Sequence, residues 1–108
     1  MNKNNQRLTG IIAIIAFASV VLLWKYNLIL LLVLSILAIL MLWMNKSKQE
    51  IKTFIFCAFF GAIFESLAIL FGVWKYDNPN LLNIPIWLIV LWGIAAIFMV
   101  RVYLYFKN

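Results

Sequence analysis

The chain has 108 residues, of which 68% are hydrophobic and 11% are charged, and its formal net charge is +6. A soluble domain is roughly half apolar and about a quarter charged, so this composition argues against both a soluble globular fold and a disordered chain. One cysteine and no histidine exclude an intramolecular disulfide framework and a Ser-His or Cys-His pair, and we expect no metal and no cofactor.

Four apolar runs of 17 to 21 residues predict an all-α, polytopic membrane protein whose four transmembrane helices pack as a small bundle. About 20 residues cross the hydrocarbon core, and only a helix satisfies the backbone polar groups there. Lys25-Tyr26-Asn27, the polar segment 45–52 and the turn-rich segment 74–85 separate the runs. The chain is therefore one transmembrane domain with helices at 8–24, 28–44, 53–73 and 86–106.

The basic residues predict the orientation of these helices. Four helices put both termini and the 45–52 segment on one side, which carries seven Lys or Arg residues against two on the other. Basic residues near helix ends favour the cytoplasm, so we expect a cell-membrane protein with both termini cytoplasmic. Because these residues are scattered beside apolar runs, they favour contact with the lipid bilayer over nucleic acid. Aromatic residues expected at the outer interface are Trp24, Tyr26, Trp74, Tyr76 and Trp87.

Glu65 is the one acid inside a predicted span and the one candidate catalytic residue. Carboxyl groups at such depth are costly and usually face the protein interior. The same face of the helix carries small residues, which let helix backbones approach closely in lipid. The last predicted helix offers two small residues, and the indole of Trp92 lies near the depth of Glu65 as a hydrogen-bond partner. The predicted packing seam consists of Ala58, Gly61, Ala62, Ala68, Gly72, Gly93 and Ala96.

Two interpretations of Glu65 stay open: a proton donor, proton carrier or counter-ion, and a hydrogen-bonded latch between helices or subunits. We expect Arg101 to extend its charged head toward the cytoplasmic interface. Ser66 is expected to bond back to a backbone carbonyl and Cys57 to act as a small packing residue. The second helix, almost entirely Leu, Ile, Val and Met, is expected to face lipid.

The stretch from Glu65 to Gly93 resembles the small membrane proteins of carotenoid synthesis, of the lycopene cyclase and carotenoid hydratase type. The resemblance lies in an acid within an apolar helix, then Phe71-Gly72, Trp74-Lys75-Tyr76, Ile84-Pro85-Ile86-Trp87 and Trp92-Gly93. It implies a membrane enzyme, or half of one, that acts on an isoprenoid with Glu65 as the acid. In the cyclases two carboxylates are adjacent, whereas here Ser66 follows Glu65.

The leading hypothesis is a non-catalytic accessory or assembly subunit of a larger membrane complex, because polar chemistry within the spans is sparse. Its expected partners are other membrane subunits or further copies of the chain. The carotenoid-type enzyme is one alternative. A proton-coupled transporter of lipophilic cations is the other, because the chain resembles the small multidrug transporters in its length, four helices and one membrane glutamate. It departs from them in that Glu65 lies on the third predicted helix and not on the first.

Overall fold

The computed structural model describes residues 3–76, 79 and 83–107, and it is all-helical within them. In chain order the helices are α1 (Lys3–Leu23), α2 (Asn27–Asn45), α3 (Lys48–Leu70) and α4 (Trp87–Lys107). All four are long and apolar enough to cross a membrane. A helix of 21 residues is about 32 Å long, close to the ~30 Å hydrocarbon core.

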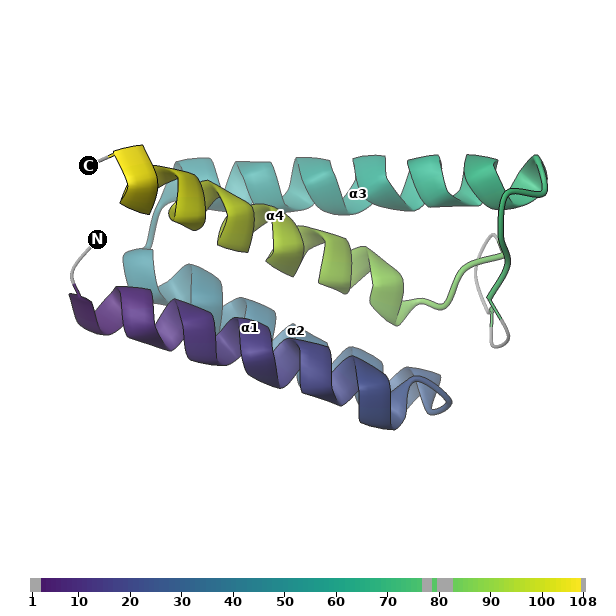
Figure 1. Cartoon of the computed structure of the whole chain (residues 1–108), viewed down its shortest axis with the longest axis horizontal. Helices are drawn as coiled ribbons and strands as arrows, with labels where there is room; N and C mark the ends of the chain where they lie inside the picture. Colours follow the sequence, from purple (N-terminus) through teal and green to yellow (C-terminus); the bar gives the residue numbers. More distant parts are fainter. Residues whose placement is uncertain (1–2, 77–78, 80–82, 108) are drawn as a thin grey trace.

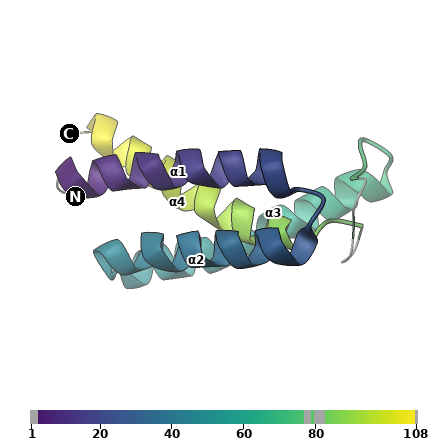
Figure 2. The same cartoon turned by 90° about the horizontal axis from the view of Figure 1, so that it is seen from below.

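Helix α4 is the centre of the arrangement, because it packs against all three other helices. Figure 1 shows α4 between α3 and the hairpin formed by α1 and α2, and Figure 2 shows the hairpin from its outer side. The start of α1, the α2–α3 connection and the end of α4 lie together at one end of the molecule, which we call the basic end. It carries Lys3, Arg7, Lys46, Lys48, Lys52 and Lys107.

Helix α2 contributes one side to the core, so the prediction that it faces lipid is wrong for that side. Leu30, Leu34 and Met41 are completely buried, and Leu37 and Ala38 are nearly so. These positions repeat at helical spacing and lie against α1 and α4. Ile29, Ile36 and Ile39, on the remaining surface of α2, are more than half exposed. Composition alone missed this division because both sides of α2 are equally apolar.

The seam between α3 and α4 depends on two glycines that receive aromatic rings from the opposite helix. A Cβ on Gly61 would lie 2.1 Å from the indole of Trp92, and a Cβ on Gly93 would lie 2.5 Å from the ring of Phe54. Ala58 and Ala62 are buried, while Ala68 and Ala96 are partly buried. The absence of side chains at the two glycines therefore lets both rings enter the seam.

Gly72, which was predicted on this seam, lies beyond it and ends the helix instead. Its φ is +79°, and nothing lies within 4 Å of the position of a Cβ. The N–H groups of Gly72 and Val73 donate to the carbonyls of Ile69 and Ala68, each at 3.0 Å. This pairing is the Schellman ending of a helix, for which glycine is favoured because it adopts positive φ without strain.

Helix α3 also starts earlier than predicted, at Lys48 rather than residue 53. The hydroxyl of Ser47 accepts a hydrogen bond from the N–H of Glu50 at 3.3 Å, which caps the first turn. The 45–52 segment is therefore mostly helical, and only a short turn at Lys46 and Ser47 joins α2 to α3. Helix α1 likewise begins at Lys3 rather than residue 8.

Gly61→Ala should open the α3–α4 seam, because the added methyl group overlaps the indole of Trp92. We expect the free energy of unfolding to fall by about 1–3 kcal/mol, as for other overpacked sites. Equilibrium unfolding of the purified protein in mixed detergent micelles measures this change. Gly10→Ala in α1 is the matched control, because nothing lies within 4 Å of its added Cβ. Equal stability of the two variants would contradict the close approach at Gly61.

Candidate functional site

The carboxylate of Glu65 accepts three hydrogen bonds from aromatic side chains. The indole of Trp92 donates to Oε1 at 3.3 Å, as the sequence predicted. The indole of Trp74 and the hydroxyl of Tyr76 both donate to Oε2, at 3.1 Å and 2.8 Å. Glu65 thus joins α3 to α4 and also fixes the segment that follows α3.

All three described partners of Glu65 are neutral donors. Both carboxyl oxygens of Glu65 act as acceptors, and Oε2 accepts two of the three bonds. A carboxyl group that protonates a substrate must present an O–H to that substrate, whereas both oxygens of Glu65 face aromatic donors of the same chain. The geometry accordingly fits a hydrogen-bonded latch better than a ready proton donor.

Tyr76 lies beyond the end of α3, and its hydroxyl is the donor in the hydrogen bond to Glu65. Burial and the hydrogen bond to Glu65 raise the pKa of the Tyr76 phenol well above its ordinary value near 10. The phenol therefore keeps its proton, and the bond to Glu65 persists, throughout the neutral and moderately alkaline range.

The remaining predicted positions divide between the surface and the core. Tyr26 and Trp74 are exposed by 57% and 41%, and Trp24 is partly buried; their place at a membrane interface stays a prediction. Trp87 is 5% exposed and turns inward, where its indole donates to the amide oxygen of Asn27 at 3.1 Å. The prediction that Ser66 bonds back to a backbone carbonyl is wrong: its buried Oγ has no hydrogen-bond partner among the residues that the structure describes.

Arg101 forms a second polar centre at the basic end, and the prediction that it reaches toward the interface is wrong. Its side chain is 2% exposed and makes a two-pronged ion pair with Glu50, with Nε–Oε2 at 3.0 Å and Nη2–Oε1 at 2.8 Å. Nη2 also donates to the carbonyl of Met41 at 2.7 Å, and Nη1 donates to the hydroxyl of Thr9 at 2.8 Å. One guanidinium therefore bonds to α1, α2 and α3 from its position on α4.

Glu50 is the residue that the sequence analysis missed, because the polar segment 45–52 reads as a loop. It is 8% exposed, and the amide of Asn45 donates to it as well, at 3.4 Å. The pattern Ser47-x-x-Glu50 is that of a helix N-terminus and could have placed Glu50 on the first turn of α3. Arg101, its partner 51 residues away, lies in no local sequence pattern that would have indicated the pairing.

The two polar centres, Arg101 with Glu50 and Glu65 with its aromatic donors, differ in whether the carboxylate is paired with a positive charge. The charge of Glu50 is matched by Arg101, whereas the described partners of Glu65 are uncharged. Within the described ranges 3–76, 79 and 83–107, no three His, Cys, Asp or Glu residues group as metal ligands. Glu65 therefore remains the candidate site, and Arg101 with Glu50 is a structural centre.

Comparison with known proteins gives one family. The profile of a family described as "Protein of unknown function (DUF2878)" matches residues 10–106. The chain belongs to this family. No curated protein and no solved structure matches it. The match covers α2, α3 and most of α1 and α4, and Arg101, Glu50 and Glu65 fall inside it. The resemblance to carotenoid synthesis proteins stays a prediction, because the family description assigns no function.

Arg101→Met should destabilise the protein by about 3–5 kcal/mol, because Glu50 would remain buried without its countercharge. The double variant Arg101→Met, Glu50→Met should lose much less than the sum of the single variants, because no unpaired charge remains. A double-mutant cycle of unfolding free energies measures this coupling. Additive effects would show that the two side chains do not interact.

Tyr76 should ionise only at a pH above the ordinary tyrosine range, because its pKa is raised. The stability that its bond to Glu65 contributes should be fully present below about pH 10, the unfolded pKa, and be lost as pH rises through the raised folded value. Tyrosinate absorbance measured against pH reports this ionisation. Tyr76→Phe should remove the most alkaline phase, and a titration unchanged by this substitution would contradict the assignment.

Proposed function

We propose that the chain is a non-catalytic accessory or assembly subunit of a larger membrane complex. The observation that carries this proposal is that side chains near both ends of α3 are hydrogen-bonded to α4, while among the described residues the helix packs through one side. Glu50 ties its first turn to Arg101, and Glu65 ties its last turns to Trp92. The packed side consists largely of small residues, at Ala58, Gly61 and Ala62.

The opposite side of α3, which we call the outer face, is dense in exposed aromatic side chains. Its members are each at least half exposed, and two of its rings stack with centroids 5.8 Å apart. Aromatic residues are enriched in the cores of protein interfaces, where they supply much contact area at little entropic cost. The outer face consists of Phe56, Phe59, Phe60, Ile63, Phe64 and Leu67.

Rigidity of α3 supports the same proposal. A binding face that is held in place before association loses little conformational freedom when a partner docks. The latches at Glu50 and Glu65 supply such preorganisation without using any residue of the outer face. We therefore expect a membrane-embedded helix of another subunit to pack on this face.

The two alternatives place the chemistry at Glu65. An enzyme that protonates an isoprenoid, or a transporter that exchanges a proton for a lipophilic cation, needs this carboxyl group to gain and release a proton. The three described donors come from the chain itself and contact both oxygens of Glu65, which supports the latch. These alternatives rank below the subunit proposal for this reason.

The proposal includes a location in the cell membrane with both termini in the cytoplasm. The basic end carries most of the Lys and Arg residues, whereas Lys25 and Lys75 lie at the connections of the opposite end. Basic residues beside membrane helices are enriched on the cytoplasmic side. The exposed Trp74 and Tyr26 then lie at the outer interface.

Site-specific photocrosslinking in intact cells tests the subunit proposal. A photoreactive phenylalanine analogue at Phe60, which is 61% exposed on the outer face, should crosslink to one polypeptide of defined mass. The same analogue at Phe17, which is 71% exposed on α1, is the matched control and should give mainly lipid adducts. Purification of the crosslinked species and mass spectrometry identify the partner.

Three results would contradict the subunit proposal. Lipid adducts alone from both positions would make the outer face a lipid-contacting surface. Conversion of an isoprenoid by the purified chain, lost in Glu65→Gln, would establish the enzyme, and proton-dependent cation flux into vesicles would establish the transporter.

The orientation is tested in the same cells. A membrane-impermeant amine reagent added outside should label Lys25 and Lys75 and spare Lys3 and Lys107.

A further inference from the structure

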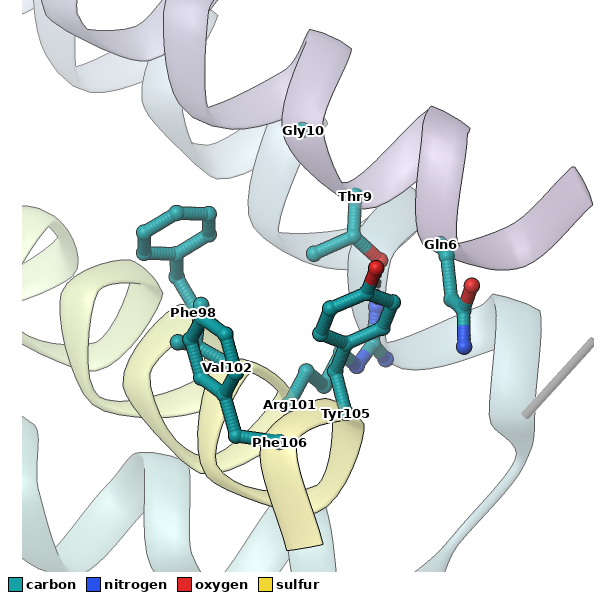
Figure 3. A pocket seen from close by; sticks show the side chains of 8 residues that line it. All are labelled: Gln6, Thr9, Gly10, Phe98, Arg101, Val102, Tyr105 and Phe106. Carbon is teal, nitrogen blue, oxygen red and sulfur yellow. Dashed lines mark hydrogen bonds between the residues drawn. The ribbon is translucent and has the colours of Figure 1, made fainter. Parts of the chain in front are cut away.

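A groove of about 290 Å³ runs between α1 and α4 at the basic end (Figure 3). Phe98, Val102, Tyr105 and Phe106 of α4 form one wall, and Gln6 and Gly10 of α1 form part of the other. From Phe98 to Phe106 the groove follows α4 for about 12 Å, at 1.5 Å per residue. Tyr105 and Phe106 are 59% and 78% exposed, so the groove is open where these two residues line it.

Gly10 leaves space in this groove that the chain itself does not use. At Gly61 and Gly93 a side chain would collide with an aromatic ring from the facing helix. A Cβ on Gly10, in contrast, would meet nothing within 4 Å. Glycine weakens a helix relative to alanine, and no neighbour in the described structure compensates for that weakness. Space at Gly10 is therefore available to a molecule from outside the chain.

The lining of the groove changes along its length from apolar to polar, which matches the acyl chain and headgroup of a phospholipid. Its inner part is hydrocarbon from Phe98 and Val102, and the charge of Arg101 at its floor is matched by Glu50. Its mouth carries the amide of Gln6 and the phenol of Tyr105. Lys3 and Arg7 are exposed on the same end of α1 and share a helix face with Gly10, at spacings of seven and three residues.

We infer that this groove binds one anionic phospholipid, with an acyl chain along Gly10, Phe98 and Val102 and the phosphate near Lys3 and Arg7. The groove runs along the helices, in the direction that acyl chains take in a bilayer. Lys3 and Arg7 share a helix face with Gly10, and no ion pair is seen for either among the described residues, so their positive charge favours an anionic headgroup over a zwitterionic one. This inference concerns α1 and α4 and does not depend on the partner proposed for α3.

Native mass spectrometry of the full chain tests the inference. The protein is reconstituted with equimolar dioleoylphosphatidylglycerol and dioleoylphosphatidylcholine, extracted gently, and released in the spectrometer. The wild type should retain one phosphatidylglycerol. Gly10→Leu, which fills the groove, should reduce this adduct at least tenfold, whereas Ala18→Leu, on an exposed site of the same helix, should not change it.

The charge component is tested separately with Lys3→Gln and Arg7→Gln. Both side chains are exposed, so these variants test the inference even where Gly10→Leu alters folding. Each should lower the preference for phosphatidylglycerol over phosphatidylcholine about fivefold. Equal retention of the two lipids by the wild type, an undiminished adduct in Gly10→Leu, or a lipid-free dimer that Gly10→Leu dissociates would overturn the inference.

Discussion

The rest of the structure depends on the buried ion pair between Arg101 and Glu50. Removing a guanidinium and a carboxylate from water is costly, and the cost is offset only when every polar group finds a partner. Here the partners come from all four helices, because Thr9 and the carbonyl of Met41 complete the set. A shift of any helix along its axis would break one of these bonds while leaving a charge buried. The pair therefore fixes the relative depth of the helices, which apolar packing between smooth faces defines only weakly.

At the opposite end of α3, Glu65 makes a latch of different character. Its donors are the indoles of Trp74 and Trp92 and the phenol of Tyr76, so the carboxylate is oriented without a countercharge. Between the two latches, Gly61 and Gly93 admit rings from the facing helix. Helix α3 is thereby held against α4 along its length, and its aromatic outer face is exposed. This division is the physical basis of our proposal that α3 contacts a partner subunit.

The elements that sequence reasoning predicted well are those with a local pattern. Apolar runs predicted four helices, and small residues at helical spacing located the α3–α4 seam and the approach of Trp92 to Glu65. The failures have physical reasons. Glu50 lies in a polar segment that reads as a loop, and Arg101 near a helix end usually reaches outward; their pairing across 51 residues leaves no periodic trace. Gly72 matched the spacing of the seam but ends the helix, since small residues serve both purposes.

The central position of α4 lets one small chain present two independent surfaces. One side of α4 joins α3, and another forms the groove with α1, so the outer face and the groove share no residue. A lipid in the groove would add contacts between α1 and α4, which pack together less extensively than α4 does with α2 or α3. It would do so at the end where Arg101 already draws Thr9 toward α4. Binding of an anionic lipid would therefore stabilise the arrangement that holds α3 in place, and would do so without competing with a partner on α3.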